Sequence, residues 1–467
     1  MHLTTALRLN ETDSKPIIAL IGAGGKSTLL FRLGNELAAA GKQTLLTSTT
    51  RLWTQQIDLA PFSVIGGDPF LLSQELPISL RGYRQVLAMA GAAPEPGKLR
   101  GLSPETICRL SALADVDAMV VEADGSRERP LKAPAGHEPV IPPCVTHVIT
   151  VAGMAGVNQP LDQRWVHRPE IAAELIGLRL GDPLTPAAIA RLLLHPAGGL
   201  KGHRAGRASF LYLNLAWDDA GLEDAADNRL AWAREIADLV LESPVAQPAY
   251  QAVLIGSAQA EDPVLEVHAR VAGVVLAAGR ANRLGGDVPK QILPWNSGNT
   301  LVGHVVDTAL ASRLLHNVFV VSGYRAEDVA EALVDRPVTL VPNPDWLAGQ
   351  SSSVRAGVHA LPSEVSAVMF LLADQPAVRS ETIDLLVEAY RRTFAPIIVP
   401  EYQGGQRGNP VLFDRRTFAE LLALQGDTGG RPVIDRYGLA VHVVSIDLPQ
   451  PQGIETMEEY RQTRSQA

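Results

Sequence analysis

A glycine and three basic residues follow a short apolar run in the second half of the chain, within the segment VVLAAGRANRLGGDVPK (274–290). Gly279 lacks a Cβ atom, so the backbone there can approach a ligand closely. Arg280, Arg283 and Lys290 add positive charge, and the arginine fork suits phosphate oxygens. The segment predicts a buried strand that runs into a loop around a triphosphate. Taken alone, an ordinary strand-to-helix turn with solvated basic residues explains it about as well.

The segment GAGGKST (22–28) is a second phosphate-binding pattern, which follows a strand-like run and precedes an amphipathic helical pattern. Backbone amides at such a helix start can cradle phosphate oxygens, and a serine or threonine hydroxyl can bind Mg²⁺. The loop is shortened, because the full pattern has a glycine where this chain has Leu20. A capped helix start that happens to carry a lysine is the weaker alternative in this β-loop-α-β context. The predicted contacts are Gly24, Gly25, Lys26, Ser27 and Thr28.

Acidic residues at the ends of strand-like runs are candidate metal ligands. Glu122 and Asp124 end one such run in the first half, and Asp374 follows another in the second half. Parallel sheets place ligands at the carboxyl ends of their strands, where these carboxylates suit Mg²⁺. A turn aspartate before proline is the alternative role for Asp374. Glu455 is a later acidic candidate, and its alternative role is a helix-start carboxylate stabilised by the helix dipole.

Several polar loops accompany these residues. Ser351 and Ser352, in GQSSSVRAG, could present hydroxyl groups at a helix start to an anion or a ribose, although serine-rich N-caps are common. The segments QRGNPVLF (406–413) and GDTGGR (426–431) are weak signals when each is taken alone. In the first half, further donors follow Asp124, and a solvated surface loop is the usual role of such a run. These donors are Arg127, Arg129, Lys132 and His137.

Strand-like and helix-like patterns alternate through both halves, which predicts an α/β fold with parallel sheets. The polar segment 257–270, which includes Pro263, is the expected linker between residues 1–262 and residues 270–467. The expected strands of the first half are 17–21, 43–50, 118–122, 147–151, 210–215 and 252–256. Those of the second half are 273–278, 318–322, 339–341, 367–373 and 396–400.

Composition narrows the class of protein. The 467 residues are 46% hydrophobic and carry a formal net charge of -9, which is ordinary for globular domains and argues against nucleic-acid binding. The N-terminus does not resemble a signal peptide, and no apolar run approaches membrane-spanning length, so a soluble cytoplasmic protein without membrane contact is expected. Cys108 and Cys144 are expected to be small buried apolar residues and not a disulfide.

Three segments of the first half, GAGGKST, TSTTRLW and EADGSRERPLKAPAGHEPVIP, together resemble the selenium-dependent hydroxylase accessory family of the YqeC type. The resemblance covers about residues 15–256, and the shortened phosphate loop belongs to the family pattern. It implies a P-loop-like nucleotide-binding α/β domain that is associated with the maturation of molybdenum hydroxylases. ATP or GTP is then the expected ligand at Lys26, and a molybdenum hydroxylase is the expected client.

The second half carries LAAGRANRLG, PKQ, GQSSSVRAG, DQPAV, RGNPVLF and GDTGGR in this order, and resembles the molybdenum cofactor cytidylyltransferase family over about residues 270–460. The resemblance implies a Rossmann-like nucleotidyltransferase domain that uses CTP and Mg²⁺, with Mo-molybdopterin as the acceptor. It assigns Lys290 to the α-phosphate and Asp374 to the catalytic Mg²⁺, with Arg283 on the triphosphate. It places around the nucleotide Ala277, Ala278, Gly279, Arg280, Arg407 and Asn409.

Two departures from the family pattern leave alternatives open. IETMEEY stands where the family has an Asp-Thr-Pro-Glu-Asp run, so Glu455 would replace a second metal ligand. GGDVPKQ resembles instead the cytidylyltransferases of isoprenoid precursor synthesis, which lack the DQP and RGNP segments. Both comparisons imply CTP, and LAAG also favours CTP over GTP. A guanylyltransferase and a non-catalytic nucleotide or pterin carrier are the alternative functions.

Overall fold

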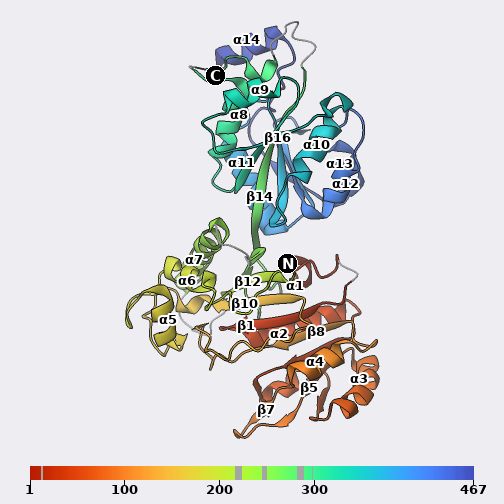
Figure 1. The fold of residues 1–467 in the computed structure, drawn as a ribbon, viewed down its shortest axis with the longest axis vertical. Coiled ribbons are helices and arrows are strands. Elements are labelled where there is room, and N and C mark those ends of the chain that lie inside the picture. The colour runs from red at the N-terminus through yellow and green to blue at the C-terminus, as the bar shows by residue number, and fades with distance from the viewer. Residues whose placement is uncertain (12–13, 216–222, 244–249, 281–288, 297, 467) are drawn as a thin grey trace. The chain divides into compact units, whose positions relative to one another are not determined.

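A computed structural model describes residues 1–11, 14–215, 223–243, 250–280, 289–296 and 298–466 (Figure 1). The predicted catalytic Arg283 lies outside these described residues. The chain divides into two compact units, Met1–His268 and Ala269–Ala467, and both are α/β, as the alternating patterns predicted. No helix in the described part of the chain is long and apolar enough to cross a lipid bilayer.

The first unit is built on a parallel sheet in the order β13-β12-β10-β1-β8-β2-β5-β4. Parallel strands are buried on both faces by their crossover helices, and four of these strands are buried along their whole length. The strands are β1 (Ile17–Gly22), β2 (Thr44–Ser48), β4 (Ser63–Ile65), β5 (Gln85–Met89), β8 (Ala118–Glu122), β10 (His147–Gly153), β12 (Ala208–Asn214) and β13 (Ala252–Gly256).

Helices connect these strands and cover the sheet (Figure 1). They are α1 (Leu3–Ala6), α2 (Lys26–Ala39), α3 (Pro69–Tyr83), α4 (Pro104–Ser111), α5 (Pro169–Ile176), α6 (Pro186–Leu194) and α7 (Glu223–Glu242). Two small sheets lie beside the main one. They are formed by β3 (Arg51–Trp53), β6 (Gly91–Ala92) and β7 (Lys98–Arg100), and by β9 (Leu131–Lys132) and β11 (Val166–His167).

Strand β8 lies between β1 and β2, although it follows both in the sequence. In the register of the sheet, Glu122 at the end of β8 pairs with Leu20 on one side and with Ser48 on the other. This order brings the carboxylate at the end of β8 next to the loop that follows β1. The order of the strands therefore joins two segments that the sequence pattern identified separately.

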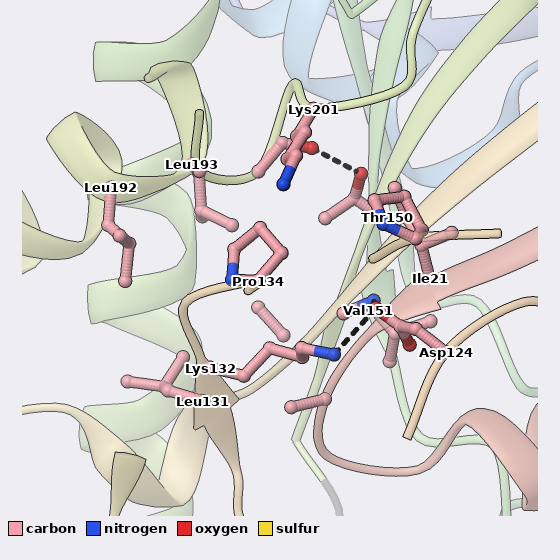
Figure 2. Close-up of a pocket in the computed structure, with 16 residues that line it drawn as sticks. Ile21, Asp124, Leu131, Lys132, Pro134, Thr150, Val151, Leu192, Leu193 and Lys201 are labelled. Atoms are coloured by element: carbon pink, nitrogen blue, oxygen red, sulfur yellow. Dashed lines mark hydrogen bonds and ion pairs between the residues drawn. The ribbon is translucent and has the colours of Figure 1, made fainter. Parts of the chain in front are cut away.

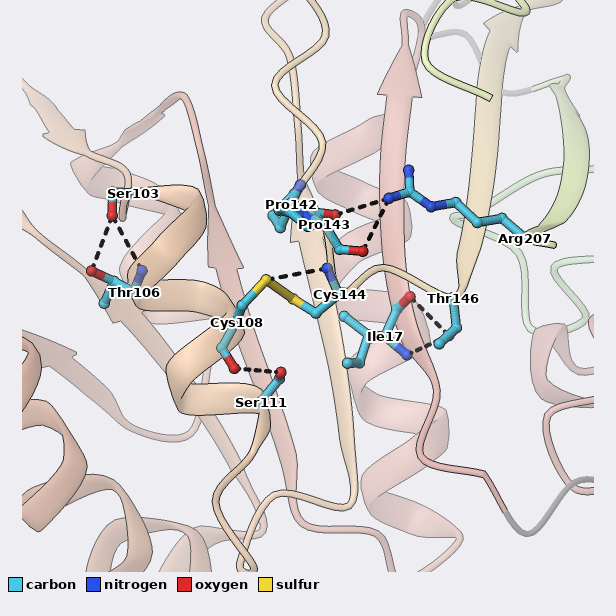
Figure 3. Close-up of a disulfide and its surroundings, with 10 residues drawn as sticks. All are labelled: Ile17, Ser103, Thr106, Cys108, Ser111, Pro142, Pro143, Cys144, Thr146 and Arg207. Carbon is cyan, nitrogen blue, oxygen red and sulfur yellow. Dashed lines mark hydrogen bonds between the residues drawn. A yellow bond between two sulfur atoms is a disulfide. The ribbon is translucent and has the colours of Figure 1, made fainter. Parts of the chain in front are cut away.

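The two cysteines form a disulfide, which corrects the expectation that they are unpaired apolar residues (Figure 3). Cys108 lies on α4, and Cys144 lies in the segment before β10, 36 residues further along the chain. Ile107 of the helix and Val145 of that segment belong to one hydrophobic cluster, which brings the two sulfur atoms together. Sequence spacing could not show this, because the contact depends on how α4 packs against the sheet.

The second unit has a mixed sheet in the order β16-β15-β14-β17-β20-β18, with β19 and β21 paired to β18. Strands β14, β15, β16 and β17 are parallel, whereas β20 is antiparallel to β17 and β18. The strands are β14 (Glu266–Ala277), β15 (Asn317–Ser322), β16 (Thr339–Pro342), β17 (Val365–Leu372), β18 (Ile397–Tyr402), β19 (Gln406–Arg407), β20 (Val411–Asp414) and β21 (Val441–Ser445). The helices are α8 (Leu301–Leu310), α9 (Ala326–Ala332), α10 (Gln350–His359), α11 (Ser380–Thr393), α12 (Phe418–Leu422), α13 (Arg431–Tyr437) and α14 (Met457–Gln466).

Two segments differ from the sequence expectations. β14 begins at Glu266, inside the segment expected to be a linker, because the polar residues at its start are buried in ion pairs with each other and with α7. Arg234 pairs with Glu266, and His268 lies 2.9 Å from the same carboxylate. The segment 406–413, expected to be a loop, contributes β19 and most of β20.

Candidate functional sites

A cleft of about 680 Å³ opens in the second unit at the carboxyl ends of β14 and β17. The two strands are adjacent, with Leu276 paired to Leu372. Both strands end here, β14 at Ala277 and β17 at Leu372. Open α/β sheets bind ligands at such positions. Of the predicted residues, the cleft is lined by Ala278, Gly279, Arg280, Lys290 and Asp374.

Lys290 and Asp374 form an ion pair in this cleft, with Nζ 2.5 Å from Oδ2. Lys290 begins a short 3₁₀ helix, and Asp374 lies two residues after β17. The main chain of Ile454 contacts both, because its carbonyl accepts a hydrogen bond from Lys290 Nζ at 3.2 Å and its N–H donates to the carbonyl of Asp374 at 2.9 Å. A positive and a negative group are thus held together at the strand ends.

Gln291 is a residue of this cleft that the sequence reasoning missed. Its Nε2 donates to the carbonyl of Gly279 at 2.7 Å, which ties the strand-end loop to the 3₁₀ helix. The side chain is only 3% exposed, and its Oε1 has no hydrogen-bond partner among the described atoms. Arg280 stacks over the ring of Tyr324, 5.3 Å from its centroid. The PKQ segment was the available signal for Gln291.

The two predicted serines lie at the start of α10 but do not line the cleft. Ser352 donates to the carbonyl of Gly349 at 2.8 Å and accepts from Asn343 at 2.9 Å, while Ser351 is fully buried beside Arg355. Their neighbour Ser353 lines the cleft instead. A helix turns by about 100° per residue, so adjacent serines face different directions.

Four other predicted residues also lie apart from the cleft lining. Ala277 ends β14 within the sheet. Arg407 and Asn409 hold the edge of the sheet through their carbonyl groups, which accept from Gln450 and Tyr402 respectively. Glu455 directly follows Ile454, so the backbone contacts of Ile454 bring it near the ion pair, and its side chain is exposed.

The carboxylate oxygens in the cleft of the second unit fit a Mg²⁺ ion. Such an ion often binds one or two carboxylates and completes its coordination shell with substrate phosphates. Asp374 and Asp427 both line the cleft. Within the described ranges, no group of three or more His, Cys, Asp or Glu residues is arranged to hold a metal without such a partner.

The first unit has a larger cleft, of about 870 Å³, beside the loop between β1 and α2. All five predicted phosphate-loop residues line it. Gly25 has a φ of 119°, which favours glycine, and α2 begins directly after it with Lys26. Ser27 Oγ donates to Glu122 Oε2 at 2.8 Å. A hydroxyl and a carboxylate are thus paired at the cleft, the donor types that suit Mg²⁺.

Lys26 is buried and turned toward its own loop. Its Nζ donates to the carbonyl of Gly22 at 2.7 Å and lies 3.3 Å from Asp124 Oδ1. Burial raises the pKa of Glu122, and this outweighs the opposite effect of Lys26 and of the hydrogen bond from Ser27. The lysine that would meet phosphates is thus held at the start of α2 by the carbonyl of Gly22 and by the carboxylates of Asp124 and Glu122.

Asp124 lies beneath the phosphate loop rather than in the large cleft (Figure 2). Its Oδ2 accepts from the N–H of Gly22 at 3.0 Å and from Lys132 Nζ at 2.9 Å. Lys132 also donates to Glu138 at 2.8 Å. Figure 2 shows Lys132 and Asp124 side by side in a small enclosed cavity. Asp124 therefore anchors the loop, whereas Glu122 faces the cleft.

Glu138 extends this buried network to Arg168, whose guanidinium contacts both carboxylate oxygens, at 2.8 and 3.1 Å. Burial alone would raise the pKa of Glu138, but the hydrogen bonds from Arg168 and Lys132 lower it to about 2. The loop after β8, which was predicted to be a solvated surface loop, is thus held by a buried chain of ion pairs from Asp124 through Lys132 and Glu138 to Arg168. Asn214, at the end of β12, was not predicted; its Nδ2 donates to the carbonyl of Gly24 at 2.7 Å.

Taken together, an α/β sheet with a glycine-marked loop, a lysine and an aspartate at its strand ends defines the second unit as a nucleotidyltransferase domain. A family model described as MobA-like NTP transferase domain matches residues 273–441, and the model described as YqeC protein matches residues 18–170. The uncharacterized protein YqeC of Escherichia coli is 33% identical over 201 residues, which are 42% of this chain and 75% of that protein. The chain therefore belongs to the YqeC family, and it joins a YqeC domain to a MobA-like NTP transferase domain.

Two relatives are similar over almost their whole length to about two fifths of this chain. Nicotine blue oxidoreductase of Paenarthrobacter nicotinovorans is 29% identical over 197 residues, which are 40% of this chain and 94% of that protein. Molybdenum cofactor cytidylyltransferase of Escherichia coli is 25% identical over 194 residues, which are 40% of this chain and 94% of that protein.

Proposed function

We propose that the second unit is a molybdenum cofactor cytidylyltransferase, which transfers CMP from CTP to Mo-molybdopterin and releases pyrophosphate during the maturation of molybdenum hydroxylases. The observation that carries this proposal is the Lys290–Asp374 ion pair at the carboxyl ends of β14 and β17. The similarity to the cytidylyltransferase of Escherichia coli supports it. Since the relatives include an oxidoreductase by name, the choice of reaction rests on these residues.

In the proposed reaction, an oxygen of the terminal phosphate of the pterin attacks the α-phosphorus of CTP. A new P–O bond forms, the bond to the oxygen that bridges the α- and β-phosphorus breaks, and pyrophosphate leaves. The chain needs to position the two phosphates and to neutralise charge, which are the main contributions to catalysis of such transfers. Lys290 would exchange its contact with Asp374 for an α-phosphate oxygen. The open backbone at Gly279 and the guanidinium of Arg280 would contact the outer phosphates.

Asp374 would hold the Mg²⁺ ion, with Glu455 as a second acidic residue nearby. When bound, the ion supplies positive charge to the phosphate oxygens. In the first unit, Ser27 and Glu122 would hold a second Mg²⁺ ion beside ATP or GTP, with Lys26 on the phosphates. This unit would then act as a nucleotide-binding accessory to the transfer. A molybdenum hydroxylase is the proposed client.

Purified protein incubated with Mo-molybdopterin, Mg²⁺ and either CTP or GTP tests the proposal. We expect pyrophosphate release with CTP that depends on the pterin, and a product heavier than the pterin by one CMP group in mass spectrometry. Faster release with GTP would identify a guanylyltransferase instead. Tight binding of CTP and pterin without any pyrophosphate would identify a non-catalytic carrier.

A further inference from the structure

We propose that the cleft of the first unit binds a second, phosphate-bearing small molecule beside the nucleotide, and that Arg127 and Arg129 hold its phosphate. This inference rests on the proposed nucleotide site at Lys26. Both arginines line the same cleft as the phosphate loop, and they lie on the turn that follows β8. The resemblance to the YqeC family does not assign a ligand to Arg127 or Arg129.

The cleft has room for more than one ligand. Its volume of about 870 Å³ lies near the upper end of the range of roughly 300–1,000 Å³ that small-molecule sites occupy. The phosphate loop lines one part of it. Two further groups of residues line other parts of the cleft. One belongs to β3 and includes Trp53, and the other belongs to the turn after β8. A nucleotide whose phosphates lie on the loop would therefore leave space beside the arginine turn.

The lining is positively charged, although the chain as a whole has a net charge of -9. Among the described lining residues, six are lysine or arginine and three are glutamate. Several of these cations are already engaged, since Lys26 faces Asp124, Arg168 pairs with Glu138, and Arg51 pairs with Glu95. The cations that face the cleft without a carboxylate partner favour a dianionic ligand.

The two arginines of the turn are available for such a ligand. Arg127 is exposed, and no hydrogen bond or ion pair involves its guanidinium within the described part of the chain. Arg129 donates through Nε to the carbonyl of Gln163 at 2.6 Å, which fixes the plane of its guanidinium. A fixed guanidinium offers its remaining N–H groups to a phosphate in the paired geometry that arginine favours.

The turn that carries these arginines is held rigidly. Arg127 and Glu128 have φ angles of 50° and 60°, a left-handed conformation that non-glycine residues adopt only when their surroundings enforce it. Lys132 holds the start of this turn, because its Nζ donates a hydrogen bond to the carbonyl of Gly125 at 2.7 Å. A turn fixed before the ligand arrives loses little conformational entropy on binding.

The turn also lies directly against the phosphate loop. The carbonyl of Pro130 accepts from the N–H of Gly153 at 2.8 Å and lies 2.7 Å from the position that a Cβ atom on Gly24 would occupy. Because Pro130 directly follows Arg129 in the chain, the arginine turn ends where the phosphate loop passes. A phosphate on Arg127 and Arg129 would therefore sit next to the nucleotide and not at a remote surface.

A titration with inorganic phosphate as the probe tests this site in the full chain. Saturating non-hydrolysable analogues of ATP and CTP first fill both triphosphate sites, and ³¹P line broadening then reports phosphate binding. We expect saturable binding that weakens at least tenfold in Arg127→Ala/Arg129→Ala, while the affinity for the ATP analogue stays within twofold. The matched control is Arg109→Ala/Arg191→Ala, which removes two exposed arginines from α4 and α6 and should change neither affinity.

Two outcomes overturn the inference: phosphate binding that is unchanged in Arg127→Ala/Arg129→Ala, and an equal loss of ATP-analogue affinity, which would make both arginines part of the nucleotide site. Lys26→Ala separates the two proposals, since it should lose the ATP analogue and keep the phosphate. If the wild type fails to bind the ATP analogue but binds phosphate through the arginines, the nucleotide assignment is contradicted and the phosphate site is supported.

Discussion

The ammonium group of Lys290 and the carboxylate of Asp374, 84 residues apart in the sequence, form an ion pair at the ends of two adjacent parallel strands. Neither side chain is deeply buried, with 15% and 22% of their surfaces exposed. The pair can therefore open without leaving an unpaired charge in a dry interior. A triphosphate and its Mg²⁺ ion would give each group a new partner of opposite charge.

Replacing either residue should abolish catalysis with little effect on folding. In Lys290→Ala and Asp374→Ala, we expect CTP-dependent pyrophosphate release to fall by about 100-fold or more, the size of effect seen when a group that stabilises transition-state charge is removed. The midpoint of thermal unfolding should change little. Arg313→Ala is the control, because it breaks an ion pair with Asp384 whose arginine is 83% exposed and outside the cleft. A variant that keeps full turnover would remove that residue from the mechanism.

Lys26 should be required for nucleotide binding by the first unit. We expect Lys26→Ala to weaken the binding of ATP or GTP at least tenfold, because the lysine at the start of α2 supplies the charge that meets the phosphates. Lys42→Ala is the matched control, since Lys42 lies beyond the far end of the same helix, about 20 Å from its start. Isothermal titration gives the affinities, and circular dichroism checks the fold. Equal affinities in both variants would contradict the assignment.

Glycine at position 24 should be essential to the loop. Gly24 has a φ of 83°, and a Cβ atom there would lie 2.5 Å from the backbone nitrogen of Gly153. Gly24→Ala should therefore destabilise the protein by about 1–3 kcal/mol and weaken nucleotide binding. The same change at Gly82, in α3, meets nothing within 4 Å and should stabilise the protein by about 0.5–1 kcal/mol. Chemical denaturation measures both, and a matching sign at the two positions would refute the steric argument.

Glu138 should make stability depend on pH in the acid range. Its pKa of about 2 in the folded protein lies below the ordinary value, so its ionised form stabilises the fold at higher pH and this contribution is lost as pH falls through about 4.5 to 2. The difference in unfolding free energy between the wild type and Glu138→Gln should shrink by about 3 kcal/mol over that window. A difference that stays constant with pH would show that Arg168 and Lys132 do not hold the ionised carboxylate.

The sequence predicted best the features that depend on local pattern. Strands such as Ala118–Glu122 and Ala252–Gly256 were expected at their observed bounds, because continuous apolar runs mark buried parallel strands. The serines that suggested an anion contact form the first turn of α10, which begins at Gln350. Polarity concealed the start of β14, where Glu266 is buried by its ion pair with Arg234.

Features that depend on packing could not be predicted. The role of Asp124 beneath the loop requires Lys132 to fold back under it, and no spacing in the sequence shows that contact. The pairing of Cys108 with Cys144 depends in the same way on how α4 meets the sheet. The role of Gln291 likewise depends on its side-chain amide reaching the carbonyl of Gly279, 12 residues earlier in the chain.

The contacts of Ile454 with Lys290 and Asp374 are made by its main chain, so they depend directly on where the backbone reaches. The stretch that connects Ser445, at the end of β21, to Ile454 therefore acts as a spacer of fixed length. Inserting or deleting a single residue in this stretch would withdraw a carbonyl from Lys290 and an amide from Asp374 together. Natural variants of this domain should consequently tolerate substitutions in the spacer much better than changes in its length.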